Sequence, residues 1–313
     1  MSRVAIVQHA PVFLDRAAAL DKAVAMLDEA ARAGARLVVF PEAFVPGYPA
    51  WIWRLRPGVD MTLTEQLHAC LRANAVDLGG DDLAPLRQAA QRHGVTVVCG
   101  VNERDGEFSR GTLYNTVVVI GPDGALLNHH RKLMPTGPER MVWGFGDATG
   151  LKAVDTPCGR VGALICWESY MPLARCALYA QGVEIYVAPT YDNGPRCVAT
   201  LQHIAREGGC WVLGSGCAFQ ARDIPDTLPG KAQMYTDADE WVNSGDSVVV
   251  APGGKIVAGP LHEALGIVYA EIDLARIGMA RRNFDVVGHS ARPDLFQLRV
   301  NTGAAQPVVF AEE

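Results

Sequence analysis

Cys166 occupies the position of a possible nucleophile. It ends the apolar run 161–165, and after Trp167 and Glu168 the residue Pro172 opens an amphipathic stretch. A thiol at such a strand-to-helix turn lies near backbone N–H groups and the positive end of a helix dipole, which lower its pKa. The sequence therefore predicts a reactive Cys166 with a lowered pKa. A buried structural cysteine fits the same pattern.

Two acidic residues and one lysine could assist this nucleophile. Glu42 follows the apolar run 37–41, so its carboxylate lies at the C-terminal end of a predicted strand, where open α/β sheets bind ligands. A segment rich in Pro and Gly separates Lys132 from Glu139, so these two residues can meet only through a loop. A lysine held against carboxylates can stabilise developing negative charge. Taken singly, Glu42 and Lys132 also fit ordinary surface positions.

Other catalytic, cofactor and metal signatures are absent from the sequence. It contains no G-x-S-x-G, G-x-x-x-x-G-K-[ST] or H-E-x-x-H motif. The eight cysteines form no C-x-x-C pair, and His129 and His130 are adjacent rather than four residues apart. We therefore predict no metal site, no cofactor and no disulfide framework.

Charge and hydropathy exclude several classes of partner. The net charge of -6 combines 28 basic with 34 acidic residues, and no block of like charge suggests binding to nucleic acid or to an anionic membrane surface. No apolar run approaches the ~20 residues that span a bilayer. The first residues enter a strand-like run without the features of a secretory leader, so we predict a cytoplasmic protein.

A repeated order of elements would position these residues. Leu20, Val24 and Leu27 have helical spacing, Gly34 marks the end of that helix, and residues 37–40 form a strand. The same order returns three more times, with strands at residues 95–98, 183–187 and 210–213. Turns at 122–124 and 252–254 favour antiparallel pairing, so we predict an α/β fold with mixed sheets.

The chain length suits a single domain. Residues 51–82 and 220–245 lack clear periodicity, and such long irregular stretches are more often functional loops than filler. We predict one domain over residues 1–280. Residues 281–313 form a tail that packs on the domain or on a neighbouring subunit.

The candidate catalytic residues and the motifs around them resemble those of the nitrilase branch of the carbon-nitrogen hydrolase superfamily. Members of that branch use Glu, Lys and Cys in this chain order, as Glu42, Lys132 and Cys166 are ordered here. The surrounding strings FPEAFVPGYP (40–49), HRKLMPT (130–136) and LICWE (164–168) are similar to the family's motifs. The likeness covers nearly the whole chain.

The resemblance implies an α-β-β-α sandwich and a cofactor-free hydrolysis of an organic nitrile to a carboxylic acid and ammonia. It implies that Glu42 is the general base and Cys166 the nucleophile. It further implies that Lys132 stabilises the oxyanion and that Glu139 orients Lys132. It also implies a homo-oligomer built from dimers through residues 172–181.

Five aromatic residues are expected near the substrate: Tyr48, Trp51, Trp143, Trp167 and Tyr191. Each also fits ordinary packing. A Trp directly after the cysteine, as at Trp167, resembles the pattern of true nitrilases and disfavours an amidase. An amidase, a cyanide-hydrolysing enzyme of the same superfamily and a non-catalytic interaction protein on this fold remain alternatives, and the particular nitrile stays open.

Overall fold

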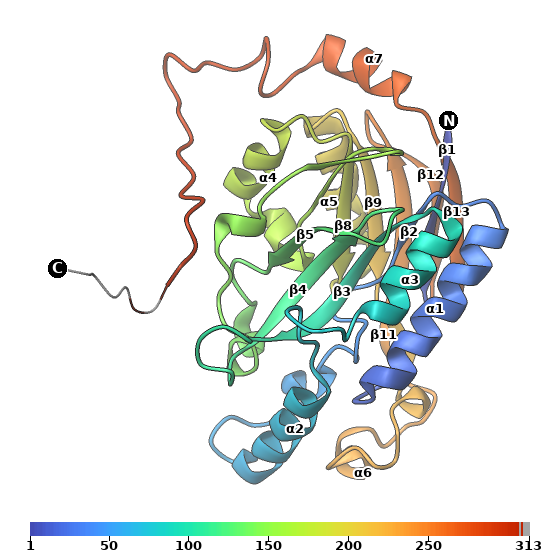
Figure 1. Cartoon of the computed structure of the whole chain (residues 1–313), viewed down its shortest axis with the longest axis vertical. Coiled ribbons are helices and arrows are strands. Elements are labelled where there is room, and N and C mark those ends of the chain that lie inside the picture. The colour runs from blue at the N-terminus through green and yellow to red at the C-terminus, as the bar shows by residue number, and fades with distance from the viewer. Residues whose placement is uncertain (307, 309–313) are drawn as a thin grey trace.

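Two β-sheets pack face to face, and helices cover the outer face of each sheet (Figure 1). The computed structural model describes residues 1–306 and 308 of the 313-residue chain. This arrangement is the α-β-β-α sandwich expected from the sequence, and the prediction of mixed sheets is confirmed.

The first sheet has the strand order β13-β1-β2-β3-β4-β5. Strands β1, β2 and β3 are parallel, whereas the other neighbours pair antiparallel. Helices α1 (Arg16–Arg32) and α3 (Ala84–His93) connect the parallel strands and pack on the outer face. The strands are β1 (Ser2–Gln8), β2 (Leu37–Val39), β3 (Thr96–Arg104), β4 (Leu113–Ile120), β5 (Leu126–Arg131) and β13 (Gly266–Ile272).

The second sheet has the order β10-β11-β9-β8-β7-β6, with β12 paired to β11. Here β7, β8 and β9 are parallel, and helices α4 (Pro172–Tyr179) and α5 (Gly194–Glu207) cover the outer face. The strands are β6 (Val154–Thr156), β7 (Gly159–Ala163), β8 (Ile185–Thr190), β9 (Trp211–Gly216), β10 (Ala218–Gln220), β11 (Trp241–Ala251) and β12 (Lys255–His262).

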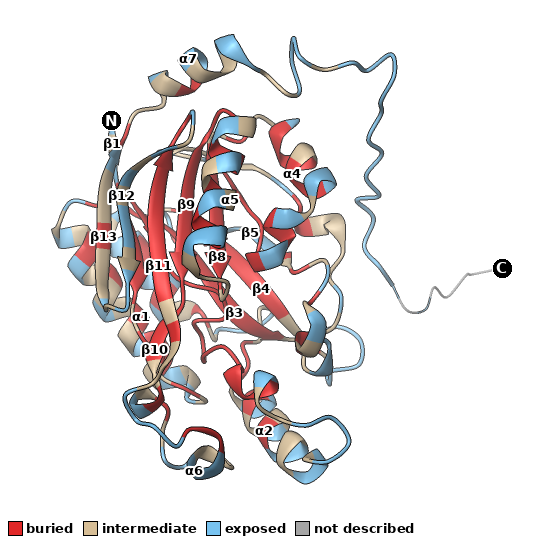
Figure 2. Ribbon diagram, turned by 180° about the vertical axis from the view of Figure 1, so that it is seen from behind, coloured by how far each residue is buried: buried red, intermediate tan, exposed pale blue. Residues whose placement is uncertain are grey.

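The main core lies between the two sheets, and both sheets are buried along most of their length (Figure 2). In β1, Val4 and Ile6 face the second sheet, whereas Ala5 and Val7 face helices α1 and α3. This period of two buries both faces of the strand. Burial of each Val or Ile contributes about 1.5–3 kcal/mol.

The segment 51–82 differs from the irregular loop that its sequence suggests. It contains the end of the 3-10 turn η1 (Ala50–Trp53) and the helix α2 (Met61–Asn74). The helix was missed because only Leu67 and Leu71 are buried on it, which leaves little apolar periodicity. Among the described residues, α2 and the other helices are too short or too polar to cross a membrane.

The segment 220–245 also holds more structure than expected. The turn η5 (Ala221–Asp223), the short helix α6 (Lys231–Met234) and the first residues of β11 lie within it. In Figure 1, α2 and α6 lie side by side at the same end of the sandwich, and a common apolar cluster joins residues of both segments. These segments therefore extend the domain at one end.

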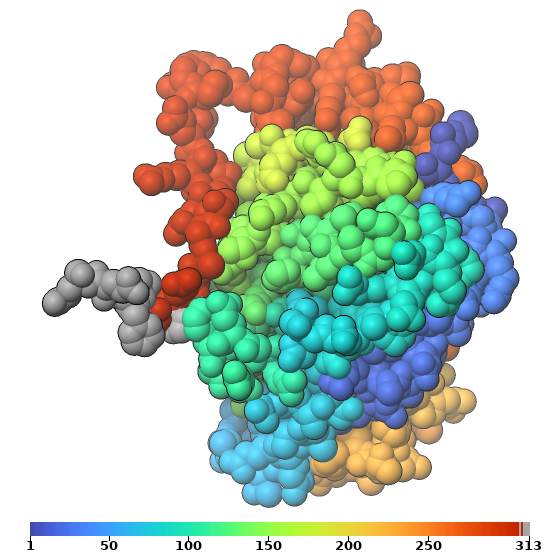
Figure 3. Space-filling model, viewed as in Figure 1, coloured from blue at the N-terminus to red at the C-terminus, as the bar shows by residue number. Residues whose placement is uncertain are grey.

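Helix α7 (Ala275–Asn283) crosses the predicted start of the tail at residue 281. After it, residues 284–306 are mostly exposed and run beside the sandwich (Figures 1 and 3). The backbone N–H of Ala305 donates to the Asp147 carboxylate at 2.9 Å. The last part of the predicted tail, residues 307 and 309–313, lies outside the described residues.

Candidate active site

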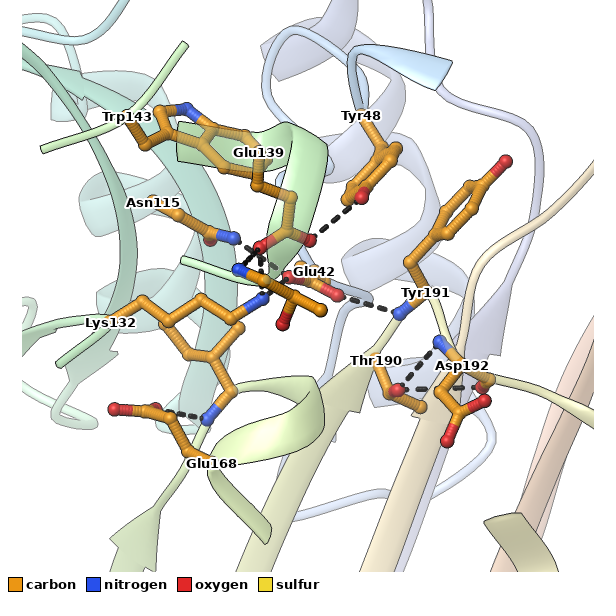
Figure 4. Close-up of polar contacts among 12 residues, drawn as sticks. Glu42, Tyr48, Asn115, Lys132, Glu139, Trp143, Glu168, Thr190, Tyr191 and Asp192 are labelled. Carbon is orange, nitrogen blue, oxygen red and sulfur yellow. Dashed lines mark hydrogen bonds and ion pairs between the residues drawn. The ribbon is translucent and has the colours of Figure 1, made fainter. Parts of the chain in front are cut away.

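A buried lysine joins two carboxylates beyond the ends of strands β2 and β5 of the first sheet. The Lys132 ammonium donates to Glu42 Oε1 at 2.9 Å and to Glu139 Oε2 at 2.7 Å, and all three side chains are almost fully buried (Figure 4). Glu42 follows β2, Lys132 follows β5, and Glu139 belongs to the 3-10 turn η2 (Gly137–Met141). The structure thus brings together three residues that are distant or separated by a loop in sequence.

Asn115 of β4 positions two of these groups, and sequence reasoning missed it. Its side-chain amide donates to Glu42 Oε1 at 2.7 Å, and its backbone carbonyl accepts from the Lys132 backbone N–H at 2.7 Å. A buried amide in a mostly apolar strand was the available signal, because buried polar groups need partners.

Glu139 is fixed from both sides. Its Oε2 accepts from the Thr136 backbone N–H at 2.7 Å, and its Oε1 accepts from the Tyr48 hydroxyl at 2.7 Å. The first contact is one half of a capping box, in which a glutamate three residues into a helical turn binds the N-cap backbone. The spacing Thr136-x-x-Glu139 is the sequence signal of this motif.

Burial and nearby charges shift the pKa values of Glu42 and Lys132. Burial raises the pKa of Glu42 above its ordinary value, although the charge of Lys132 opposes this shift. For Lys132, burial alone lowers the pKa, but Glu42, Cys166 and Glu139 together raise it well above its ordinary value. Lys132 therefore stays cationic, and Glu42 accepts a proton more readily than an ordinary carboxylate.

Cys166 begins the 3-10 turn η4 (Cys166–Tyr170) with a φ of +54°, so the sharp turn expected at this residue is present. The predicted lowering of its pKa is wrong. Burial first, and then the Glu42 charge, raise the pKa of the thiol, although Lys132 opposes the shift. The cause is location: the thiol is only 7% exposed and lies near carboxylates, and α4 begins only at Pro172.

A cavity of about 250 Å³ opens onto the thiol. It is lined by Tyr48, Trp53, Thr136, Glu139, Cys166, Trp167, Tyr191, Asp192 and Asn193. The rings of Tyr48 and Tyr191 stack at 3.8 Å between centroids, and the Tyr191 backbone N–H donates to Glu42 Oε2 at 2.6 Å. Trp167 is 52% exposed and packs edge-on against Tyr170.

Three of the five aromatic residues expected near the substrate line this cavity: Tyr48, Trp167 and Tyr191. Trp51 is buried in the turn η1 and does not line it. Trp143 does not line it either. It is buried behind Tyr48, whose ring it contacts edge-on at 5.6 Å, and its indole N–H donates to Asn102. Sequence reasoning missed Trp53, which lines the cavity and donates to the Tyr48 hydroxyl at 3.2 Å.

Metal-assisted chemistry would need a cluster of ligands. Within residues 1–306 and 308, no group of three or more His, Cys, Asp or Glu side chains could hold a metal ion. The arrangement instead supplies a thiol, a carboxylate base with a raised pKa and a fixed cation. These groups suit nucleophilic catalysis at an electrophilic carbon.

Comparison with known proteins agrees with this chemistry. The carbon-nitrogen hydrolase family model matches residues 3–282. Nitrilase 3 of Arabidopsis thaliana is 43% identical over 98% of this chain and 89% of its own length. An aliphatic nitrilase of Sinorhizobium fredii is 43% identical over 98% of each protein. The structure is similar to that of a carbon-nitrogen hydrolase from Helicobacter pylori G27, with a TM-score of 0.70 and 21% identity over 94% of this chain and 96% of the other.

Proposed function

The chain belongs to the carbon-nitrogen hydrolase family, and we propose that it is a nitrilase, which converts an organic nitrile to the carboxylic acid and ammonia. One observation carries this proposal. A buried Glu42–Lys132–Glu139 network lies beside the cavity that contains Cys166, in a chain 43% identical to proteins named nitrilases.

The first chemical step is attack of Cys166 on the nitrile carbon. Because burial raises the pKa of the thiol, the thiolate is not the resting form, and a base must remove the proton as attack proceeds. Glu42 takes this role, since its own pKa is raised and it contributes to the electrostatic environment of the thiol. The Cys166–carbon bond forms, and the nitrile nitrogen gains a proton to give a thioimidate.

Hydrolysis of the thioimidate consumes two waters. Glu42 activates the first water, which adds to the thioimidate carbon, and ammonia leaves from the tetrahedral species to give a thioester. A second water releases the acid and restores the thiol, so one nitrile and two waters give one acid and one ammonia. Lys132 and the Trp167 backbone N–H stabilise the negative charge that develops in these steps.

Glu139 acts through Lys132 in this scheme. The Lys132 ammonium donates to both Glu42 and Glu139, so the second carboxylate limits the directions in which the cation can point. A fixed cation needs no reorganisation when charge develops. Tyr48 in turn holds Glu139 and forms part of the cavity wall.

The test compares ammonia release from aliphatic, aromatic and arylacetonitriles with release from the matching amides. We expect higher kcat/KM for nitriles, and no turnover in Cys166→Ala. The alanine variant should keep its fold, because a small residue replaces a small residue. Turnover by Cys166→Ala would refute the proposed nucleophile, and equal efficiency with amides would favour an amidase.

We also propose that the protein is a homo-oligomer built from dimers that pair through α4. Of the apolar residues on this helix, Ala177 and Leu178 are buried within the chain. Leu173 is 66% exposed and, together with Trp167 and Tyr170, gives an outward apolar surface at η4 and α4. Such a surface is typical of contacts between subunits.

A further inference from the structure

Glu168 is a buried carboxylate beside the active site that the mechanism does not use. It lies two residues after Cys166, its side chain is fully buried, and it is not among the residues that line the cavity. Contact with a substrate in that cavity is therefore not its role. Buried carboxylates are costly unless they are hydrogen-bonded, so the partners of Glu168 indicate what it does.

The partners of Glu168 are the peptides next to two proposed catalytic residues. Its Oε1 accepts from the backbone N–H of Leu133 at 2.6 Å, and its Oε2 accepts from the backbone N–H of Ile165 at 2.6 Å. Figure 4 shows Glu168 near Lys132 with one of its hydrogen bonds drawn. Leu133 directly follows Lys132, and Ile165 directly precedes Cys166.

These two peptides come from different sheets. The segment of Leu133 follows β5 at the edge of the first sheet, whereas Ile165 follows β7 in the second sheet. The ring of His130, a residue of β5, donates through Nε2 to the same carboxylate at 3.1–3.2 Å. The Glu168 side chain thus joins the two sheets next to Lys132 of the first sheet and Cys166 of the second.

The segment near Cys166 needs such a restraint. Cys166 adopts a φ of +54°, which is uncommon for a residue other than glycine and persists only when the surroundings determine it. The Ile165 N–H bond acts on the residue directly before this turn. Loss of that bond would free the turn to relax.

We propose that Glu168 is a positioning residue that sets the distance and direction between the Lys132 ammonium and the Cys166 thiol across the two sheets. The inference rests on the proposed function, because it takes Lys132 and Cys166 as the reacting pair. Glu168 acts through the backbone on each side and touches neither substrate nor the reacting atoms.

The two-sided contact requires a carboxylate. A carboxylate has two acceptor oxygens, whereas the amide of Glu168→Gln has one acceptor oxygen and one donor nitrogen. Either orientation of the amide places its NH₂ against a backbone N–H, of Leu133 or of Ile165. Glu168→Gln therefore removes one side of the contact at nearly constant size.

Glu184 provides a matched control at the other end of β7, the strand that precedes Ile165. Its Oε2 accepts a single backbone N–H, from Arg160 of β7, at 2.8 Å. In Glu184→Gln the amide can turn its oxygen toward that one donor. Both variants exchange a carboxylate for an amide beside β7, but only Glu168→Gln disturbs a contact next to proposed catalytic residues.

The experiment measures kcat, KM, melting temperature and backbone hydrogen exchange for both variants in the full-length protein. We expect kcat of Glu168→Gln to fall on the order of a hundredfold, the effect of about 1 Å of misplacement, with little change in KM. The peptide whose N–H loses its acceptor, the one containing Leu133 or the one containing Ile165, should exchange faster in Glu168→Gln than in the wild type. Glu184→Gln should keep the wild-type kcat.

Unchanged kcat in folded Glu168→Gln, or equal losses in both variants, would overturn the proposal. If Glu168→Gln does not fold, Glu168→Asp replaces it, because it keeps both oxygens on a shorter arm. Its kcat should then fall with unchanged KM, and a wild-type kcat would overturn the proposal. Where Glu168→Gln and Glu168→Asp both fold, Glu168→Asp should have the higher kcat. A wild type inactive on nitriles would refute the proposed function, whereas unchanged exchange at Leu133 and Ile165 in a folded variant refutes the contact itself.

Discussion

Cys166 and Glu42, the proposed nucleophile and base, both have raised pKa values. Burial is the first cause in each case, and Lys132 opposes the shift in each case. A protonated thiol beside a carboxylate base can lose its proton as the carbon–sulfur bond forms. In the proposed mechanism the reactivity of this cysteine therefore comes from the base Glu42, rather than from a thiolate present at rest.

The free enzyme should reveal the raised thiol pKa through its alkylation rate. A thiol with a pKa above its ordinary value of 9.0 is protonated at neutral pH, so its thiolate fraction grows about tenfold per pH unit. We expect iodoacetamide labelling of Cys166 to keep rising with pH and to show no plateau below pH 9. Peptide mapping separates it from the more accessible Cys70 and Cys176. A plateau near neutral pH would indicate a resting thiolate.

Tyr48→Phe should reduce catalysis more than stability. It removes the hydroxyl that donates to Glu139 Oε1 and accepts from the Trp53 indole, while the stack on Tyr191 remains. A hydrogen bond to a charged group contributes about 1.5–3 kcal/mol, so kcat should fall roughly tenfold to a hundredfold.

Tyr179→Phe is the matched control for this prediction. The Tyr179 hydroxyl also donates to a carboxylate, that of Glu207 at 2.8 Å, but it lies on α4 outside the cavity. This variant should lose some stability in urea and keep its kcat. Similar kcat values for both variants would show that Glu139 does not need the Tyr48 contact.

At the scale of elements, the site depends on where strands end and how closely they approach. Glu42 follows β2, and the neighbouring strand β3 lies close to that segment. A Cβ on Gly100 of β3 would lie 2.3 Å from the Pro41 carbonyl oxygen and 2.8 Å from the Glu42 Cα. Glycine at this position allows β3 to pack closely against Glu42 and so to support it.

Gly100→Ala should therefore displace Glu42 and lower both stability and activity. Overpacking of a tight core position costs about 1–3 kcal/mol, and the backbone atoms that the new methyl group meets cannot rotate away. Denaturation in urea gives the stability change, and kcat with the preferred nitrile gives the functional loss.

The control is Gly278→Ala in α7, where nothing beyond the adjacent residues and the helix's own backbone lies within 4 Å of the new Cβ. Alanine is favoured over glycine in a helix by about 1 kcal/mol, so this variant should be as stable as the wild type or more stable. Its kcat should not change. If Gly100→Ala behaves in the same way, β3 does not support Glu42 as described.

At the scale of the whole molecule, the sandwich places the cavity where both sheets contribute. Lys132 follows a strand of the first sheet, and Cys166 and Tyr191 follow strands of the second. The mouth of the cavity carries the exposed Trp167, next to the apolar residues Tyr170 and Leu173. An assembled dimer through α4 would thus cover a surface that adjoins the substrate entrance.

Light scattering of the purified protein tests this assembly. We expect a mass larger than one chain at micromolar concentration, and we expect Leu173→Glu to shift it toward the monomer. The charge falls on a residue that is 66% exposed, so the fold of the chain should not change. Phe108→Glu, at an exposed apolar residue between β3 and β4, is the control and should keep the wild-type mass. A monomeric wild type would remove the proposal.

The sequence by itself determined the class of fold and the identity of the main chemical groups. Glycine-terminated amphipathic stretches followed by β-branched runs predicted α1, α3, α4 and α5 with their strands, because period and turn chemistry are local properties. The order Glu42, Lys132, Cys166 and its surrounding motifs indicated the family. Helix α2 was missed because its buried face holds too few apolar residues to show a period.

Only the tertiary structure decided how these groups act on one another. The raised pKa of Cys166 depends on burial beside Glu42, which lies more than a hundred residues away in sequence. The tertiary structure also decided that Asn115 contacts Glu42 and that Trp53 lines the cavity. It placed Trp143 behind the cavity rather than on its wall. Solvation and charge act through space, so a pKa or a cavity wall cannot be read from neighbours along the chain.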